Sequence, residues 1–402
     1  MNNSSKVPLK LNLIIKISAI VLLCIGCFRI FSLLPYAIDP KADFYTYYHA
    51  GELILSGKSI YSFHNMQPPS ICLIFSPLAV FSYETAAIIW VIVTIIAYLA
   101  IVVISFQVFN FNFPAHWRMF LVMIALSWYP FLIHISVGQV NILLSLLIIL
   151  AWFLLKKNHD FSGGALLGFA CVLKLFPGIF VLYLCIRKKW RALVAFITTV
   201  VIGLIITTTI IGIDDTSWYF LKVIPQDSPL WSAHPFNLSL RSTIDMIFQG
   251  NIYIQPLIQS KLTALIVTVI IYGACIITLF VQQFKIPRSL TGDDIAFCIC
   301  IIVMLLISPI TWQHIYPILV FPLFFLSSRY FLLHETTSLR YALIVFLFLS
   351  IPSHEIATGI FHLESSSVMP WYLGVALQVP MLGSILLWIA LSKTACKVIP
   401  KK

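Results

Sequence analysis

Long apolar runs, separated by short polar segments, limit what this chain can fold into. Only 10% of its 402 residues are charged and 60% are hydrophobic, whereas soluble domains carry about 25% charged residues. The sequence therefore predicts an all-α, polytopic membrane protein, one integral membrane domain over residues 1–402, with about 11–12 transmembrane helices at about 20 residues each. The runs lie at about 11–34, 86–108, 118–136, 141–155, 163–186, 190–212, 262–283, 294–308, 316–327, 340–352 and 371–391.

Basic residues outnumber acidic ones by 25 to 14, which gives a formal net charge of +11. Such an excess also occurs in nucleic-acid-binding proteins, but here the basic residues cluster beside apolar runs. This is the positive-inside pattern, in which lysine and arginine mark the cytoplasmic ends of spans. We therefore expect a multi-pass protein of the inner (plasma) membrane and no nucleic-acid partner. The clusters are Lys6/Lys10, Lys156-Lys157, Arg187-Lys188-Lys189/Arg191, Lys285/Arg288, Arg329/Arg340 and Lys393/Lys397/Lys401-Lys402.

One apolar run, 163–186, has basic clusters at both ends, so a single crossing would place them on opposite sides of the membrane. Lys174 and Pro177 lie near the middle of this run. Proline breaks a helix, and broken helices are tolerated at membrane depth where they line a cavity. We therefore predict a hairpin of two half-helices near Lys174, which keeps every basic cluster cytoplasmic.

This topology places both chain ends in the cytoplasm and three longer segments outside, at about 35–85, 213–261 and 353–370. The first run is too long for a cleaved signal peptide and is expected to be retained. The first outer segment is rich in aromatic and apolar residues, so we expect it to form helices that lie on the membrane. Polar residues from the whole chain then share the outer, periplasmic face: Asp43, Gln139, Asn141, Lys174, Asp214, Asp215, His234, Asn237, Arg241 and His314.

Lys174 has two interpretations. A lysine near a helix end can extend its ammonium to the membrane interface. Alternatively, it supplies a cation for the phosphate of a lipid-linked substrate. A lysine at membrane depth costs about 2.5–3.5 kcal/mol on insertion scales, and the broken helix beside it exposes backbone N–H groups that also hold anions. The broken helix favours the phosphate site.

Asp43 also has two interpretations. Aspartate is a favoured N-cap, and a helix is expected over about 44–55. Alternatively, Asp43 is a general base that takes a proton from an acceptor hydroxyl, and one side chain can do both. Asp39 competes for the role of base, but it precedes Pro40 and fits a turn.

The remaining candidates leave similar alternatives. His314 is either a histidine at the membrane interface beside Trp312 or a ligand for a phosphate or sugar hydroxyl. Arg241 and His234 either pair with lipid headgroups or bind the substrate.

No cofactor or metal is expected from the sequence. The nine cysteines lie mostly inside apolar runs, without metal-ligand spacing. Asp214 and Asp215 resemble a metal-binding pair, but no third carboxylate or histidine lies close in sequence. Glycine-rich phosphate loops, zinc motifs and nucleophile elbows are not found.

Several short motifs, taken in order, resemble those of the family-87 glycosyltransferases over about residues 40–327. The late motif combines a Ser-Pro pair with Trp-x-His. The motifs are Asp43-Phe-Tyr-x-Tyr-Tyr-x-Ala50 with Gly57, Tyr61 and Pro68-Pro69; Ser76-Pro77-Leu78 with Ala86 and Trp90; Gly138-Gln139-Val140-Asn141; Gly164, Gly168, Lys174 and Pro177; Asn237-Leu-Ser-Leu-Arg241; and Ser308-Pro309…Trp312-x-His314.

The resemblance implies the fold of the C-type membrane glycosyltransferase superfamily. These enzymes take a sugar from a polyprenyl-phosphate carrier on the outer membrane face, and the best-characterised members of family 87 are α-1,2-mannosyltransferases of phosphatidylinositol mannosides. By this resemblance Asp43 is the base and His314 contacts the donor phosphate or sugar. The implied partners are a polyprenyl-phosphate-linked sugar donor, a lipid or glycan acceptor, and membrane lipids.

The residues and the resemblance together predict an inverting transfer of mannose or another hexose to an acceptor hydroxyl. The donor is expected to be bound by five residues: Lys174, His314, Arg241, His234 and Asn237. Further substrate contacts are expected from five others: Gln139, Asn141, Tyr47, Tyr48 and Trp312.

A transporter or flippase of a lipid-linked or anionic solute is the alternative, since a buried lysine and a broken helix suit it as well. The gathering of polar residues at one face, and not at the midplane, favours the enzyme, as does the lack of an evident inverted repeat.

Overall fold

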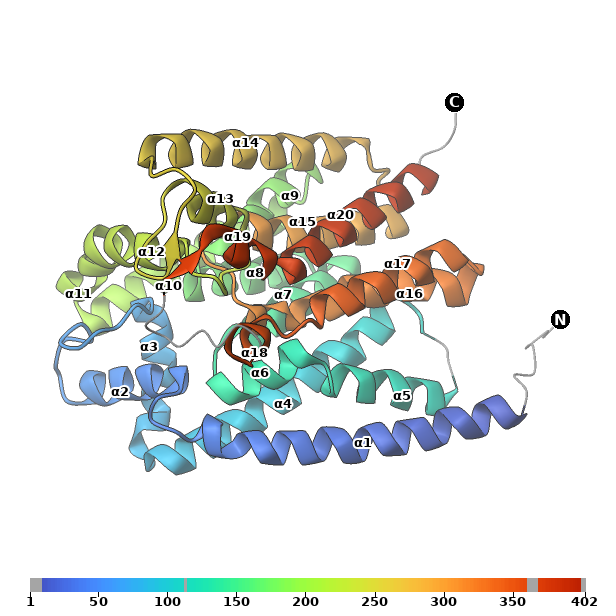
Figure 1. Cartoon of the computed structure of the whole chain (residues 1–402), viewed down its shortest axis with the longest axis horizontal. Helices are drawn as coiled ribbons and strands as arrows, with labels where there is room; N and C mark the ends of the chain where they lie inside the picture. Colours follow the sequence, from blue (N-terminus) through green and yellow to red (C-terminus); the bar gives the residue numbers. More distant parts are fainter. Residues whose placement is uncertain (1–8, 112–113, 360–367, 399–402) are drawn as a thin grey trace.

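The computed structural model describes residues 9–111, 114–359 and 368–398, and these are almost entirely helical, as predicted (Figure 1). Two short strands, β1 (Ile254–Gln255) and β2 (Met369–Pro370), pair in parallel. The helices are α1 (Leu9–Ala37), α2 (Asp43–Leu55), α3 (Pro69–Phe75), η1 (Ser76–Val80), α4 (Tyr83–Val108), α5 (Ala115–Leu126), α6 (Tyr129–Val137), α7 (Asn141–Lys156), α8 (Asp160–Leu173), η2 (Phe176–Ile179), α9 (Phe180–Ile186), α10 (Trp190–Ile211), α11 (Ile213–Trp218), η3 (Tyr219–Val223), α12 (Ile224–Ser232), α13 (Leu240–Phe248), α14 (Lys261–Lys285), α15 (Leu290–Ile307), η4 (Gln313–Leu319), α16 (Val320–Leu333), α17 (Thr336–Leu349), α18 (Ser353–Gly359), α19 (Trp371–Ala376) and α20 (Val379–Val398).

Within the described ranges, seven helices are long and apolar enough to cross a membrane, and up to nine if two bent pairs each count as one span. This is fewer than the predicted 11–12. The difference arises because two predicted runs, 141–155 and 163–186, fold as helices of fewer than 18 residues. Such helices, at 1.5 Å per residue, are shorter than the hydrocarbon core.

The predicted hairpin near Lys174 is confirmed. Helix α8 ends at Leu173, Lys174 is extended (φ −144°, ψ 137°), and the chain returns through η2 and α9. Lys189, which follows the end of α9, has its Nζ 3.0 Å from Oδ1 of Asp160, the first residue of α8. Both ends of the hairpin therefore lie on one side of the molecule.

A close approach between α8 and α10 fixes the hairpin in place. A Cβ atom on Gly164 would overlap the backbone of Ala192 in α10. Only glycine allows the two helices to come this near, which is the packing that small residues provide in membrane proteins.

The basic clusters meet acidic residues at one end of the helix bundle, which we call the basic face. Lys156 Nζ lies 2.8 Å from Asp294 Oδ2, and Arg187 Nη1 lies 3.4 Å from Asp293 Oδ1. Arg288 Nη2 donates to the carbonyl of Ile186 at 3.0 Å. Three basic clusters that were predicted to lie on one side of the membrane, those of Lys156, Arg187 and Arg288, therefore lie at the same end of the bundle. Lys156 and Arg187 contact the start of α15, and Arg288 contacts the segment just before Arg187.

The opposite end, the loop face, carries the connections 38–82 and 212–260 and the described parts, 350–359 and 368–378, of a third. In Figure 1 helices α2, α3, α11 and α12 lie on the left, while α1 begins and α20 ends on the right. Asp215 joins two of these connections, since its carboxylate accepts from Ser59 Oγ at 2.6 Å and from the N–H of Ile60 at 2.8 Å. The loop face is thus a packed layer of short helices.

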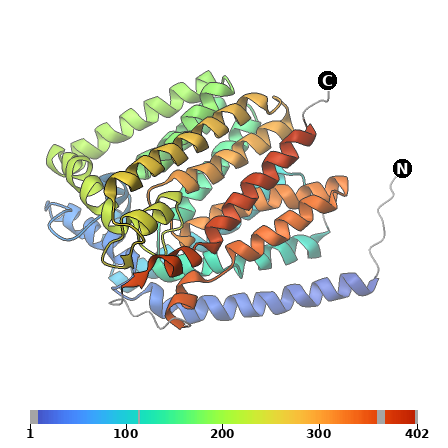
Figure 2. The same cartoon turned by 45° about the horizontal axis from the view of Figure 1, so that its top comes forward.

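Burial differs sharply among the long helices, which run side by side in Figure 2. In α15, 78% of the apolar span is buried, against 11% in α1 and 17% in both α10 and α14. The span from Gln313 to Leu333, formed by η4 and α16, is also 78% buried. Helices that are apolar yet exposed are expected to face the lipid, whereas α15 and α16 lie in the centre of the bundle.

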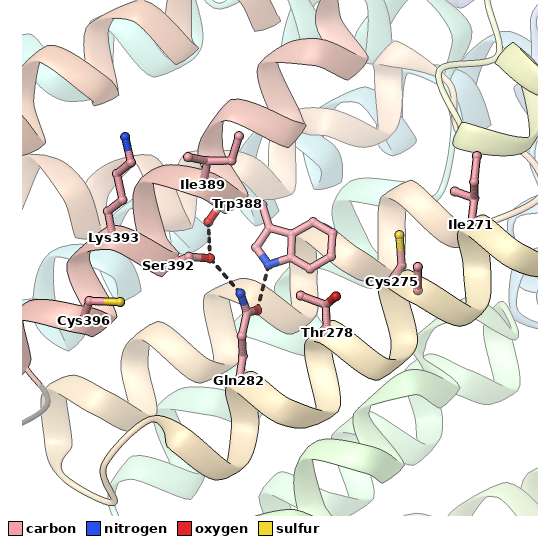
Figure 3. Close-up of a pocket in the computed structure, with 10 residues that line it drawn as sticks. Ile271, Cys275, Thr278, Gln282, Trp388, Ile389, Ser392, Lys393 and Cys396 are labelled. Atoms are coloured by element: carbon pink, nitrogen blue, oxygen red, sulfur yellow. Dashed lines mark hydrogen bonds between the residues drawn. The ribbon is translucent and has the colours of Figure 1, made fainter.

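A groove of about 500 Å³ lies between α14 and α20 on the outside of the bundle (Figure 3). Its polar groups bond to each other: Gln282 Oε1 accepts from Trp388 Nε1 at 2.8 Å, and Gln282 Nε2 donates to Ser392 Oγ at 2.9 Å. The groove contains none of the predicted site residues.

Candidate active site

Asp43 is the first residue of α2, and its carboxylate faces the turn between α6 and α7. Gln139 Nε2 donates to Asp43 Oδ2 at 2.6 Å, and Tyr47 Oη donates to Gln139 Oε1, also at 2.6 Å. The N-cap of α2 is Ala42, without a side-chain capping bond. The interpretation of Asp43 as an N-cap is therefore wrong, and its partner is a side chain almost a hundred residues away.

The turn that presents Gln139 depends on Gly138. This residue ends α6 in the left-handed region (φ +68°), and a Cβ there would lie 2.7 Å from Phe44 Cβ. Trp90 Nε1 donates to the carbonyl of Gly138 at 2.9 Å. The turn therefore packs directly against the start of α2, which brings the amide of Gln139 to Asp43.

Lys174, at the tip of the hairpin, reaches the same turn. Its Nζ donates to Asn141 Oδ1 at 3.1 Å, and Asn141 is buried. The ammonium also interacts electrostatically with Asp43, His134 and His314. Lys174 is thus hydrogen-bonded within the protein, which argues against the interpretation of a side chain extended to the membrane interface.

His314 enters the site from η4. It is only 8% exposed, and its ring stacks near Trp312 with 6.4 Å between ring centroids. Its backbone carbonyl accepts from His134 Nδ1 at 2.8 Å. This burial argues against the alternative of a surface histidine at the membrane interface.

His134 is a member of this cluster that the sequence analysis missed. It is completely buried in α6, and its ring centroid lies 6.3 Å from that of His314. One signal was available: a histidine inside an apolar run, four residues before the Gly138–Gln139 turn, is an ionisable group at membrane depth.

Asn237 has a different place. Its Nδ2 donates to the carbonyls of Trp231, Ser232 and Pro309, and its Oδ1 accepts from the N–H of Thr311 at 2.9 Å. With all its hydrogen-bonding groups used inside the protein, Asn237 ties the second long loop to the segment that carries His314.

Two other predicted donor-binding residues have partners of their own. Arg241 Nε bonds to Asp245 Oδ2 at 3.2 Å. His234 lies among Trp231, Tyr253 and Trp312, with ring centroids 4.6–5.4 Å away. Burial there lowers the pKa of His234 to about 4, with a smaller contribution from His354. At neutral pH His234 therefore carries no positive charge.

The remaining aromatic candidates are divided. Tyr47 belongs to the Asp43 chain through Gln139. Tyr48 instead donates to the carbonyl of Phe81 at 2.8 Å, which fixes the first loop. Trp312 is half-buried between His234 and His314.

The pair Asp214 and Asp215 was considered for metal binding. Asp215 uses both carboxylate oxygens to hold the first loop. Over the ranges that the structure describes, no group of three His, Cys, Asp or Glu side chains is arranged to hold a metal ion.

Burial governs the electrostatics of Asp43. It raises the pKa of this carboxyl above its usual value of 3.8, while the hydrogen bond from Gln139 and the charge of Lys174 act in the opposite direction. A raised pKa makes a carboxylate a stronger base.

Comparison with known proteins identifies the chain. The sequence model of glycosyltransferase family 87 matches residues 65–309, more than half of the chain. The protein belongs to glycosyltransferase family 87, which confirms the predicted resemblance. The match includes Gln139, Asn141 and Lys174, whereas Asp43 precedes it and His314 follows it.

A relative from Mycobacterium tuberculosis (strain CDC 1551 / Oshkosh) is 25% identical over 256 residues, which cover 61% of this chain and 54% of the relative. It is a polyprenol-phosphate-mannose-dependent alpha-(1-2)-phosphatidylinositol pentamannoside mannosyltransferase. The chain thus matches about half the length of this curated relative.

Proposed function

We propose that this protein is an inverting membrane glycosyltransferase that moves a sugar from a polyprenyl-phosphate donor to an acceptor hydroxyl. One observation carries the proposal: Asp43 and Lys174, from distant parts of the chain, interact across the Gln139–Asn141 turn. A base and a cation on either side of one small site suit an acceptor hydroxyl and a leaving phosphate. Membership of a glycosyltransferase family favours this enzyme over a transporter or flippase.

Asp43 acts as the general base. Its Oδ2 is held by Gln139, and none of the described residues donates a hydrogen bond to Oδ1. Oδ1 takes the proton of the acceptor hydroxyl as the hydroxyl oxygen attacks the anomeric carbon of the donor. The bond between that carbon and the phosphate oxygen breaks on the opposite side, and its electron pair leaves with the polyprenyl phosphate. One displacement inverts the anomeric centre.

Lys174 and His314 hold the phosphate. Negative charge grows on the bridging oxygen as the bond breaks, and a preorganised cation stabilises this charge most in the transition state. Asn141, which is bonded to Lys174, orients the ammonium. Since the leaving group is already a phosphate, its departure needs no further activation.

The donor sugar is proposed to be mannose or another hexose, on the strength of the relative's activity. The acceptor is proposed to be a lipid- or glycan-linked hydroxyl. The polyprenyl tail lies in the lipid beside the bundle. The basic clusters at the opposite face support a site on the periplasmic side of the inner membrane.

The experiment is turnover by purified protein in liposomes. Polyprenyl-phosphate mannose, glucose and galactose are supplied with a lipid extract as the source of acceptor, and release of polyprenyl phosphate is measured. We expect Asp43→Asn to lose about 100-fold or more, since general base catalysis contributes about 10²–10⁴-fold. Asp39→Asn is the matched control and keeps its activity. Full turnover by Asp43→Asn contradicts the role of Asp43, and no release from any of the donors contradicts the function.

A further inference from the structure

Two buried polar atoms beside the candidate site have no hydrogen-bond partner in the described structure. They are His134 Nε2 and Asn141 Nδ2. His134 is 0% exposed and Asn141 is 1% exposed, so bulk water does not reach either side chain. Leaving a buried polar group unpaired costs about 1–3 kcal/mol. Two such groups beside one lysine indicate a place where a polar ligand completes the bonding.

The hydrogen bond from His134 defines which chemistry its second nitrogen offers. Nδ1 lies 2.8 Å from the backbone carbonyl oxygen of His314. A carbonyl oxygen only accepts, so Nδ1 carries the proton. A second proton on Nε2 would place a buried positive charge near the Lys174 ammonium, with which the ring already interacts. Nε2 therefore presents a lone pair, which accepts a hydrogen bond and does not donate one.

The lone pair on Nε2 excludes hydrogen-bond acceptors as partners and selects hydrogen-bond donors. Phosphate oxygens also accept, so they are poor partners for Nε2. A hydroxyl is a good partner, because it donates. The backbone carbonyl of Gln139 also interacts with the ring, but it does not form a hydrogen bond of normal distance and angle with Nε2.

We propose that His134 Nε2 accepts a hydrogen bond from a sugar hydroxyl of the bound substrate, and that this bond contributes to the choice of sugar. The inference rests on the proposed function. The neighbours of the ring favour the donor sugar: Lys174 and His314, assigned to the donor phosphate, both interact with His134. A hydroxyl of the acceptor sugar has the same chemistry, and the test distinguishes the two sources.

The experiment uses two substitutions that separate the nitrogens of His134. Asparagine at this position keeps an N–H close to Nδ1, so it still bonds to the carbonyl of His314, but it lacks Nε2. Glutamine places its amide oxygen near Nε2 and keeps the acceptor. His64→Asn, at an exposed position in the first loop, is the matched control.

Binding is measured without acceptor, for the polyprenyl-phosphate hexose that the protein uses and for analogues that each lack one hydroxyl. We expect wild-type protein to bind one of these analogues about 5–150-fold more weakly than the parent, the range of a buried hydrogen bond of about 1–3 kcal/mol. In His134→Asn the ratio for that analogue falls to about one and the other ratios stay unchanged. His134→Gln and His64→Asn retain the wild-type ratios, which excludes a general loss of structure.

The other outcomes are equally defined. If the loss of discrimination is found with deoxy acceptors in turnover assays, and not with deoxy donors, Nε2 contacts the acceptor sugar. If all donor and acceptor ratios are the same in His134→Asn and wild type, the inference is wrong. If wild-type protein binds no polyprenyl-phosphate hexose at all, the proposed function itself is wrong.

Discussion

The amide of Gln139 holds Asp43 by a 2.6 Å hydrogen bond to Oδ2. The same side chain accepts from the hydroxyl of Tyr47. An amide has both a donor and an acceptor group. Gln139 therefore orients the carboxylate of Asp43 through its N–H while its oxygen is held by Tyr47, and no titratable proton lies between Gln139 and Asp43. The carboxylate therefore keeps one oxygen available for chemistry.

Replacing Gln139 by leucine removes a bond that stabilises the ionised form of Asp43. The pKa of Asp43 then rises further, so turnover is lost at a higher pH on acidification than in the wild type. We also expect turnover at neutral pH to fall about 10-fold, the loss for one hydrogen bond of about 1.5 kcal/mol to a charged group. Turnover measured against pH tests this, and an unshifted acid limb contradicts it. Tyr47→Phe, which keeps the Gln139–Asp43 bond, is expected to shift the limb less.

Asp43 should lower the stability of the fold at neutral pH. Burial raises its pKa in the folded state above the usual 3.8, so the folded state binds a proton more readily than the unfolded state. Stability from this group is present below pH 3.8 and is lost as the pH rises through the folded-state pKa. We expect Asp43→Asn to unfold at a higher temperature than wild type at pH 7, although it is inactive. The difference should shrink on acidification; an equal or lower unfolding temperature at pH 7 is the contrary result.

Lys174→Met should weaken donor binding while keeping the shape of the side chain. Hydrogen bonds to charged groups contribute about 1.5–3 kcal/mol, so we expect the dissociation constant to rise about 10–150-fold. Titration with a polyprenyl-phosphate sugar measures this. Lys58→Met, in an exposed part of the first loop, is the matched control and leaves the constant unchanged. Equal affinities in the two variants would exclude Lys174 from the phosphate site.

Gly138→Ala tests the turn that carries Gln139. The new Cβ would meet Phe44 at 2.7 Å, in a residue at φ +68°. Gly57 is a matched control, since it has nearly the same φ, +66°, with no atom within 4 Å of a Cβ. We expect Gly57→Ala to cost about 1 kcal/mol of backbone strain with normal turnover. Gly138→Ala should cost more, about 2–4 kcal/mol once the overpacking is added, and should lose activity. Similar unfolding temperatures and turnover in the two variants would show that the contact with Phe44 has no role.

The hairpin can be tested by labelling. In a cysteine-free background, single cysteines at Lys157 and Lys188 should react with a membrane-impermeant thiol reagent from the same side. A cysteine at His64 should react from the other side. The ion pair between Asp160 and Lys189 requires this result. Labelling of the Lys188 position from the same side as His64 would instead mean that the run crosses the membrane once.

Charge and helix breaking carried much of the fold prediction. Placing lysine or arginine inside the bilayer has a large free-energy cost. The basic clusters around Lys156 and Arg187 were therefore expected on the same side of the membrane, which predicted the hairpin from the sequence. The length of the spans was harder to predict. The run 118–136 was expected to be one span, but α5 ends before its C-cap Ser127 and the chain bends 51° into α6, which has Pro130 in its first turn.

For the candidate site, the sequence indicated Asp43, Lys174 and His314 because burying a charged or polar group at the membrane costs free energy, which makes such a group a candidate for function. It did not indicate what each one bonds to. The side chain of Asn237 donates to the backbone carbonyl of Pro309 and accepts from the N–H of Thr311, more than seventy residues later, and this pairing exists only after folding. His134 was overlooked because a single buried histidine in an apolar run has the same local pattern whether it packs or binds.

The position of His314 late in the chain determines when, during synthesis, the candidate site is complete. Asp43 leaves the ribosome early, whereas the partners that complete its surroundings come from the Gly138 turn, the hairpin and finally η4. Shorter nascent chains contain Asp43, the proposed base, but not all of the residues proposed to bind the phosphate. The proposed site is therefore complete only after α15 and η4, late in the chain, have been synthesised.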